Sequence, residues 1–323
     1  MKALVQEGSG SADVLHLREI DAPTVADDRV RVQVRAASVN AADYHVVHGA
    51  AIVGVIGKLL RQTPKPVRGI DLAGVVEAVG KNVTTLRPGD EVFGMGTGTW
   101  AEYAIGTERS LLQKPAGISF VEAGAIGVAA LTALQGLRDH GRVRPGQRVL
   151  IYGAGGGVGT FAVQIAKALE AHVTAVTSPR NMDVVRPLGA DVLVDYTKED
   201  VATREARYDV ILDVAATRSL RDLRRMLVPG GTLVCPGAAK RGGWLGILAR
   251  VLAVMVRSRV LRQRVVFYVA SVTRDDLAYL TSLIEAGRLR PAIERTYPLD
   301  DAREAVRYAM SGQARGKIVI TVS

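Results

Sequence analysis

The chain of 323 residues carries 42 Lys and Arg against 32 Asp and Glu, a formal net charge of +10, and a single cysteine. Its length suggests two domains, and 48% hydrophobic with 23% charged residues excludes a disordered chain. One cysteine excludes a disulfide framework and any zinc site built from several thiolates. The positive charge favours an anionic partner: a phosphorylated cofactor, a nucleic acid or an acidic membrane surface.

Residues 1–110 are predicted to form short strands between turns. Side chains alternate in character over 30–36, residues 72–79 are apolar and β-branched, and the turn at Gly89 leads into a further strand. From about residue 120 the pattern changes to a helix over 121–137, followed by alternating strands and helices. The expected strands are 148–152, 172–177, 191–195, 209–214 and 232–235. This alternation predicts a parallel sheet with right-handed crossovers.

The last part of the chain is predicted to return to a mixed pattern. After residue 271 we expect a helix, a strand over 292–297, a helix over 300–310 and a strand over 317–322. The first residues lack the apolar core of a secretory signal, and no apolar run reaches 18 residues without a charge. We therefore expect a cytoplasmic protein.

A glycine-rich loop is the most informative segment. The apolar strand 149–152 runs directly into five glycines in seven residues, and an amphipathic helical pattern follows. Glycines allow a backbone to approach a pyrophosphate, and the helix N-terminus offers it free N–H groups. The segment predicts a dinucleotide site, with a structural glycine turn as the alternative. Its expected cofactor contacts are Gly153, Gly155, Gly156, Gly157, Val158 and Gly159.

The end of the second strand predicts which dinucleotide binds. An NAD site requires an acid there to hold the ribose 2′-hydroxyl. Here residues 177–181 read Thr-Ser-Pro-Arg-Asn, and the first acid is Asp183. Ser178 and Arg180 suit a 2′-phosphate, which an acid would repel. We predict NADPH; the alternative for Arg180 is a solvated residue at a helix start.

Several further motifs resemble those of the medium-chain dehydrogenase/reductase superfamily, in particular its zinc-independent quinone oxidoreductase branch, which includes zeta-crystallin and chloroplast-envelope enone reductases. They are Ala-Ser-Val-Asn-Ala-Ala-Asp-Tyr at 37–44, Gly-Ile-Asp-Leu-Ala-Gly-Val-Val at 69–76, Arg-Pro-Gly-Asp-Glu-Val at 87–92, Leu-Thr-Ala-Leu at 131–134, Val-Asp-Tyr at 194–196 and Ala-Arg-Gly-Lys-Ile-Val at 314–319. The resemblance covers essentially the whole chain. It implies an α/β fold with a GroES-like β-barrel catalytic domain (1–122 and 272–323) and a Rossmann doubly wound parallel-sheet NADP-binding domain (123–271).

The same resemblance argues against a catalytic metal. Zinc members have a cysteine near Asn40 and a Gly-His-Glu motif, whereas this chain has no cysteine there and Gly69-Ile70-Asp71 at the second place. The lone Cys235 is expected to be a core residue. Without a Lewis acid, a quinone or an α,β-unsaturated carbonyl is the better hydride acceptor, because it delocalises the charge that hydride addition creates.

The resemblance also assigns site residues. Asn40 is expected near the nicotinamide ribose, and Tyr44 is the candidate proton donor; the alternative for Tyr44 is a packing aromatic. Many quinone oxidoreductases have the tyrosine five residues after the asparagine, where this chain has His45. For Asp43 we favour a local hydrogen bond over catalysis. Weaker carry-overs to the cofactor are Thr132, Tyr196, Arg315 and Lys317, with helix packing as the alternative for Thr132 and a solvated charge pair for the last two.

Two apolar segments stand apart from these motifs. They are 50–60 and 244–264, and on a helix the second would align Arg250, Arg257 and Arg264 in one basic stripe. We interpret them as a mouth for a lipophilic quinone or enone, with peripheral contact to an anionic membrane as a further hypothesis. A lid, buried packing and a dimer interface are the alternatives.

The sequence therefore predicts an NADPH-dependent, zinc-independent reductase of a small hydrophobic quinone or enone, expected as a homodimer. The alternatives are an NADP-dependent alcohol/aldehyde oxidoreductase and a non-catalytic NADPH- or RNA-binding protein. Dispersed basic residues and an aromatic content of 5% argue against RNA. The sequence does not name the physiological substrate.

Overall fold

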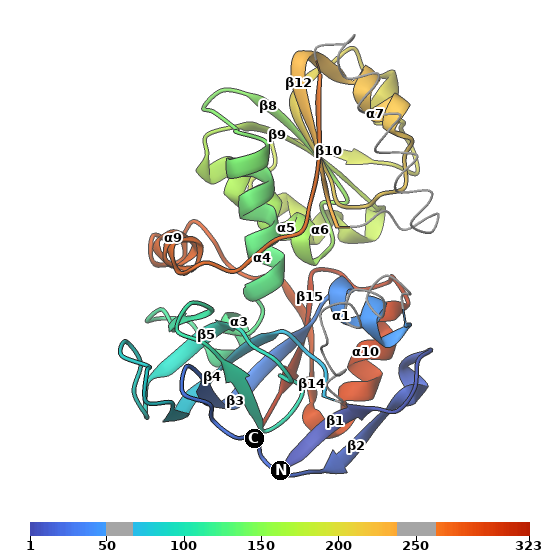
Figure 1. The fold of residues 1–323 in the computed structure, drawn as a ribbon. Coiled ribbons are helices and arrows are strands. Elements are labelled where there is room, and N and C mark those ends of the chain that lie inside the picture. The colour runs from blue at the N-terminus through green and yellow to red at the C-terminus, as the bar shows by residue number, and fades with distance from the viewer. Residues whose placement is uncertain (50–66, 238–262) are drawn as a thin grey trace. The chain divides into compact units, whose positions relative to one another are not determined.

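The computed structural model describes residues 1–49, 67–237 and 263–323 (Figure 1). These form two compact units, Met1–Ala129 with Val272–Ser323, and Ala130–Ser271. We expected the first boundary after residue 122. Helix α3 (Phe120–Ala123) packs on strands of the first unit, however, which places it and the start of α4 (Gly127–Leu134) with that unit.

The first unit is built mainly of strands. They are β1 (Lys2–Gln6), β2 (Leu15–Glu19), β3 (Val30–Val39), β4 (Asp71–Val79), β5 (Glu91–Met95), β6 (Tyr103–Gly106), β7 (Leu111–Gln113), β14 (Ile293–Pro298) and β15 (Lys317–Thr321). Its further helices are α1 (Ala41–Val47), α9 (Arg274–Glu285) and α10 (Ala302–Met310), with 3₁₀ turns at Ala12–Val14 and Leu299–Asp301. In Figure 1 the red β14, β15 and α10, from the end of the chain, lie among blue and cyan elements from its start.

Strand β3 organises the main sheet of this unit. Within the described residues the sheet order is β14-β15-β3-β4-β5-β7, and β6 also pairs with β3. Because β3 runs antiparallel to both β4 and β15, its end meets the starts of both neighbours, with Ala37 opposite Leu72 and Val39 opposite Ile318. This register brings together residues 38–40, 71 and 317, which are far apart in the sequence.

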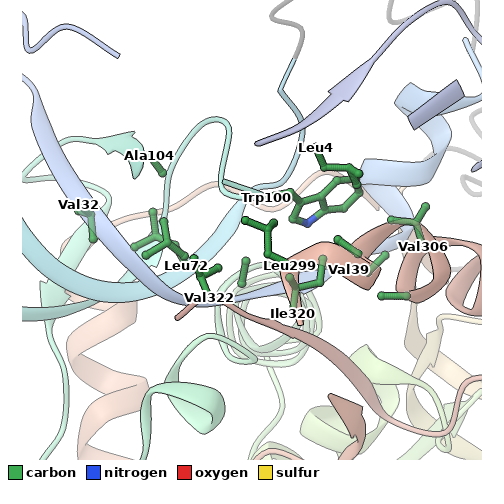
Figure 2. Packing of buried hydrophobic residues seen from close by; sticks show 14 of the residues in the cluster. Leu4, Val32, Val39, Leu72, Trp100, Ala104, Leu299, Val306, Ile320 and Val322 are labelled. Carbon is green, nitrogen blue, oxygen red and sulfur yellow. The ribbon is translucent and has the colours of Figure 1, made fainter. Parts of the chain in front are cut away.

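A hydrophobic cluster fills the first unit. Alternation along β3 turns Val30, Val32 and Val34 inward, as the sequence predicts. Figure 2 shows the wholly buried Trp100 ring among side chains from β3, β15 and α10. The indole nitrogen donates a hydrogen bond to the carbonyl of Ser38 at 3.2 Å, so the ring is both packed and satisfied.

The second unit contains a parallel sheet. Its strands are β8 (Arg148–Tyr152), β9 (His172–Thr177), β10 (Val192–Asp195), β11 (Tyr208–Asp213), β12 (Leu227–Pro236) and β13 (Arg264–Tyr268). Its helices are the rest of α4, a π-helical turn (Gln135–His140), α5 (Gly157–Ala168), α6 (Met182–Val185) and α7 (Leu220–Arg225), with 3₁₀ turns at Pro179–Asn181, Arg186–Leu188 and Val201–Thr203. In the described part of the chain the order is β10-β9-β8-β11-β12-β13, with every pair parallel.

This sheet confirms the predicted parallel α/β arrangement, and β8, β9 and β10 follow the expected ranges closely. One expectation is wrong. Arg264 begins strand β13, paired with Thr232, so it cannot extend a helical arginine stripe. The residues that follow it are the half-buried Val265, Val266 and Phe267. Such β-branched and aromatic side chains are common in strands. The segment 50–60, Arg250 and Arg257 lie outside the described residues.

Candidate functional site

The glycine loop in the second unit joins β8 to α5. Gly153 has a φ of +92°, which L-residues with side chains rarely adopt. A Cβ on Gly159 would lie 2.2 Å from the carbonyl oxygen of Gly153, so the helix packs directly on the loop. Gly156 precedes α5 and supplies no side-chain cap. The first N–H groups of α5 are therefore suited to an anionic ligand.

Two buried polar atoms lie beside this loop. Thr177 Oγ1 and Asn181 Oδ1 have no hydrogen-bond partner among the described residues. A Cβ on Gly155 would meet the Asn181 amide nitrogen at 2.4 Å and Thr177 Oγ1 at 2.6 Å. Unpaired buried polar atoms are costly, and a polar ligand on the loop would satisfy them. The shape of the loop, the free N–H groups of the helix terminus and the two unpaired polar atoms therefore fit a dinucleotide.

Ser178 and Arg180, expected at the ribose 2′-phosphate, and Tyr196, expected at the adenosine end of the cofactor, follow the carboxyl ends of β9 and β10. Asp195 pairs with Thr177 across these strands, and the backbone N–H of Tyr196 donates to the Thr177 carbonyl at 3.2 Å. Ser178 and Arg180 follow Thr177 directly, with Arg180 exposed and the Tyr196 side chain 55% exposed. The structure thus brings Ser178, Arg180 and Tyr196 to one edge of the sheet.

Thr132 lies in α4 just before the helix changes to π-helical geometry. The buried Tyr268 hydroxyl donates to the Thr132 backbone carbonyl, and burial raises the pKa of Tyr268, which keeps it a donor. The Gln135 amide donates to the Ser271 carbonyl at 2.6 Å and accepts from the Ser271 N–H at 3.1 Å. Three hydrogen bonds thereby fix the helix around Thr132 to the end of β13 and to Ser271, which follows that strand.

In the first unit, Asn40 follows β3 directly and is the N-cap residue of α1. Its amide oxygen accepts from the Lys317 ammonium at 2.7 Å, and its amide nitrogen donates to Asp71 Oδ2 at 2.9 Å. Asn40 is 7% exposed, whereas Asp71 and Lys317 are wholly buried at 0% and 2%. Lys317 is therefore not a solvated charge, and its ammonium points at Asn40 and Asp71. Arg315 instead pairs with Glu294 at 3.1 Å with 44% of its side chain exposed.

Helix α1 carries two further polar groups. The buried Asp43 carboxylate accepts from the Asn40 backbone N–H at 2.9 Å, which is the local hydrogen bond favoured from the sequence. Burial, followed by the charge of Asp71, raises the pKa of Asp43 to about 7. Tyr44 is half-buried, with its ring 5.0 Å from that of His45. Burial raises the pKa of Tyr44, so its hydroxyl stays protonated and able to donate near neutral pH.

Comparison with known proteins identifies the family. An alcohol dehydrogenase GroES-like domain model matches residues 26–116, and a zinc-binding dehydrogenase model matches residues 188–320. A mitochondrial NAD(P)H oxidoreductase from Bos taurus is 33% identical, covering 100% of this chain and 89% of the relative. The solved quinone oxidoreductase from Coxiella burnetii is 28% identical with a TM-score of 0.89, covering 100% of this chain and 99% of that structure.

The chain belongs to the quinone oxidoreductase branch of the medium-chain dehydrogenase/reductase superfamily. The predicted family, the GroES-like domain with its Rossmann partner and the NAD(P)-dependent oxidoreductase class are confirmed. A 2-methylene-furan-3-one reductase from Solanum lycopersicum is also 30% identical, covering 99% of this chain and 79% of that protein. The individual site residues stay predictions.

The surroundings of Asp71 in this medium-chain reductase do not fit a zinc ion, although the family model that matches residues 188–320 is described as a zinc-binding dehydrogenase. Asp71 Oδ2 accepts from Ser38 at 2.7 Å and from Asn40 at 2.9 Å, while Oδ1 accepts from the Val128 N–H at 2.7 Å. The Lys317 ammonium lies 3.3 Å from Oδ2 and would repel a dication. Within 1–49, 67–237 and 263–323, no three His, Cys, Asp or Glu side chains are placed to hold a metal.

Some residues of these sites received no role from the sequence. They are Gln135, Thr177, Asn181 and Tyr268, together with Asp71, which was noted only as a departure from Gly-His-Glu. A charged residue at the start of each of two apolar runs, Asp71 and Lys317, is the pattern that could have predicted a buried pair. No helix in the described part of the reductase is long and apolar enough to cross a membrane.

Proposed function

We propose that this reductase transfers a hydride from NADPH to a quinone or an α,β-unsaturated carbonyl compound. The observation that carries the proposal is the Asp71–Lys317 pair. The Asp71 carboxylate, at the Gly-Ile-Asp motif, accepts three hydrogen bonds and lies beside the Lys317 ammonium. A site without a Lewis acid favours an acceptor that delocalises its own negative charge. Relatives named as quinone oxidoreductases and as a 2-methylene-furan-3-one reductase support these two substrate classes.

The choice of NADPH over NADH rests on the end of β9. Ser178 and Arg180 supply a hydroxyl and a guanidinium, and the segment between β9 and Asp183 contains no acid. A guanidinium pairs well with a phosphate, whereas the acid typical of NAD sites would repel it. The loop from Gly153 to Gly159 would hold the pyrophosphate. Thr177 Oγ1 and Asn181 Oδ1 would form hydrogen bonds with neighbouring polar groups of the cofactor.

Bound NADPH would supply the hydride, and the chain would supply orientation and a proton. The family resemblance supports a role for Asn40 at the nicotinamide ribose and for Thr132 at the nicotinamide. Hydride addition to the acceptor creates an enolate or quinolate. The Tyr44 hydroxyl, kept protonated by its raised pKa, would donate to that oxygen; its O–H bond breaks as the acceptor's O–H bond forms, and solvent returns the proton to Tyr44.

A substrate panel tests the reaction. NADPH absorbance is followed at saturating cofactor with quinones, conjugated enones, simple aldehydes and simple ketones. We expect turnover with quinones, enones or both. Turnover confined to simple aldehydes and ketones would overturn the proposal in favour of an alcohol/aldehyde oxidoreductase. Binding of NADPH without turnover of any acceptor would favour a non-catalytic NADPH-binding protein, for which RNA retention is measured separately.

Arg180→Ala tests the cofactor choice. If the guanidinium binds the 2′-phosphate, the variant weakens NADPH binding about tenfold, equivalent to about 1.4 kcal/mol, and leaves NADH binding unchanged. Arg87→Ala is the matched control, because the Arg87 side chain is also exposed, at 87%, and lies in the other unit. An unchanged ratio of NADPH to NADH affinity in Arg180→Ala contradicts the assignment.

We also propose a cytoplasmic homodimer, following the family resemblance and the sequence. Light scattering at several protein concentrations measures the oligomeric state, and a monomer throughout contradicts the dimer. Co-sedimentation with anionic and neutral vesicles tests peripheral membrane contact, which is contradicted if neither vesicle binds the protein.

A further inference from the structure

A closed network of buried polar side chains surrounds Asn40. Ser38, Asn40, Asp71 and Lys317 are each at most 7% exposed. The register of β3 against β4 and β15 brings them together, because Asp71 starts β4, Lys317 starts β15 and Asn40 follows β3. The network is thus fixed by three strands of one sheet rather than by a loop.

Asp71 is the hub of this network. Its Oδ2 receives hydrogen bonds from Ser38 at 2.7 Å, Asn40 at 2.9 Å and Lys317 at 3.3 Å. Its Oδ1 receives the Val128 N–H at 2.7 Å, and a Cβ on Gly127 would come within 2.2 Å of that oxygen. Asp71 is therefore held from both sides and presents a fixed acceptor to the Asn40 amide.

The buried charges are not explained by stability. Removing an ammonium and a carboxylate from water costs more than their attraction commonly returns, and an apolar pair of similar volume is often as stable. The pair is also imperfect, since Lys317 lies closer to the neutral Asn40 oxygen, at 2.7 Å, than to Asp71, at 3.3 Å. The shorter contact points to the amide as the partner on which Lys317 acts.

The two charges leave Asn40 only one amide orientation. An ammonium can only donate hydrogen bonds and an ionised carboxylate can only accept them. A flipped amide would turn its N–H groups toward Lys317 and its oxygen toward Asp71, so both contacts would become repulsive. The amide oxygen of Asn40 is therefore held toward Lys317, and its nitrogen toward Asp71.

We propose that Lys317, acting with Asp71, is a positioning residue that fixes the amide of Asn40 for hydride transfer. The inference rests on the proposed function and deepens it by assigning a role to a side chain that cannot reach solvent. Asn40 is the group that meets the cofactor. Lys317 acts through Asn40 and contacts no ligand itself.

Two variants separate orientation from stability. Lys317→Met removes the donor to the Asn40 oxygen but leaves the Asp71 carboxylate buried without its cation. Asp71→Asn/Lys317→Met removes both charges, so that neither member of the pair is left buried without the other. Lys2→Met is the matched control, because the Lys2–Asp300 pair also spans 3.3 Å but is exposed. For each, kcat, NADPH affinity, the kinetic isotope effect with deuterated NADPH and the thermal midpoint are measured.

We expect kcat to fall about 10- to 100-fold in both Lys317 variants, since a misplaced positioning group slows the chemical step. The isotope effect rises, NADPH affinity changes less than about threefold, and the thermal midpoint recovers in the doubly neutral variant. In an Asn40→Ala background, Lys317→Met lowers kcat by less than a further twofold, because the group it positions is gone. Lys2→Met leaves every value unchanged.

Recovery of kcat together with the thermal midpoint in the doubly neutral variant would show a merely structural pair and overturn the inference. A full additional loss in the Asn40→Ala background would do the same. A wild-type chain that reduces no quinone or enone overturns the proposed function instead. The inference is then decided by NMR of the Asn40 side-chain amide, assigned by its loss in Asn40→Ala: its resonances move in both Lys317 variants if Lys317 orients it, and stay in place if it does not.

Discussion

Asp43 offers the sharpest test of the electrostatics of the first unit. This carboxyl is 3% exposed, and burial together with the charge of Asp71 raises its pKa from 3.8 to about 7. Asp43→Asn removes the titrating group but keeps an oxygen that can accept the Asn40 N–H, which now lies 2.9 Å from the carboxylate. The substitution therefore isolates the ionisation from the hydrogen bond.

The direction in which the unfolding free energy changes with pH follows from the protonation equilibria of Asp43 in the folded and unfolded states. The folded state binds the proton more tightly than the unfolded state, so Asp43 contributes full stability below about pH 4 and loses it as the pH rises through about 7. Between these limits the slope approaches about 1.4 kcal/mol of unfolding free energy per pH unit. Over three pH units the wild type loses up to about 4 kcal/mol relative to Asp43→Asn.

Urea unfolding at several pH values between 4 and 7.5 measures this difference. The wholly buried Trp100 reports on the unit that contains Asp43, and replacing the second tryptophan, Trp244→Phe, leaves it the sole indole probe. Asp28→Asn is the control, because that side chain is 66% exposed. Parallel stability curves for the wild type and Asp43→Asn, or a relative gain for the wild type as the pH rises, would refute the reasoning.

Two further predictions concern the second unit. Gly159→Ala would place a Cβ 2.2 Å from the Gly153 carbonyl oxygen, so we expect a loss of about 1–3 kcal/mol in unfolding free energy and weaker dinucleotide binding. In the control variant Gly156→Ala the atom nearest to the new Cβ is 3.7 Å away, so its stability should match the wild type. Equal thermal midpoints for the two variants would contradict this. Tyr268→Phe keeps the ring against His140 but removes the hydroxyl that donates to the Thr132 carbonyl, which should lower the unfolding free energy by about 1–3 kcal/mol in denaturant titrations; an unchanged stability would contradict this.

The sequence predicted the elements whose patterns are local. The change from two-residue alternation to strand–helix alternation predicted the strand-rich first unit and the parallel sheet, and β9 was predicted with its observed bounds, His172–Thr177. Strand β13 was missed because residues 264–268 follow a long apolar stretch with arginines seven apart, which suits a helix equally well. Local periodicity cannot separate these alternatives when pairing with β12 decides the outcome.

The site was predicted less completely, because its decisive contacts are long-range. Asn40 and the glycine loop were proposed from motifs and their roles stay predictions, whereas the bonds of Lys317 to Asn40 and Asp71 join residues 277 and 246 positions apart. The apolar run that follows Lys317 suggests a buried lysine, but the local sequence does not identify the residues that it contacts. The same holds for Tyr268, whose partner Thr132 is 136 residues away.

The place of Lys317 at the start of β15 has a consequence for the order in which the protein matures. Ser38, Asn40 and Asp71 belong to β3, the residue after it and the start of β4, whereas the cation that completes their network lies 246 residues beyond Asp71. Until β15 pairs with β3, the Asp71 carboxylate has no ammonium beside it and the Asn40 oxygen lacks its donor. Assembly of this cluster therefore cannot be completed before β15 is synthesised, and a chain cut short before β15 would contain the predicted dinucleotide loop yet lack the side chain proposed to orient Asn40.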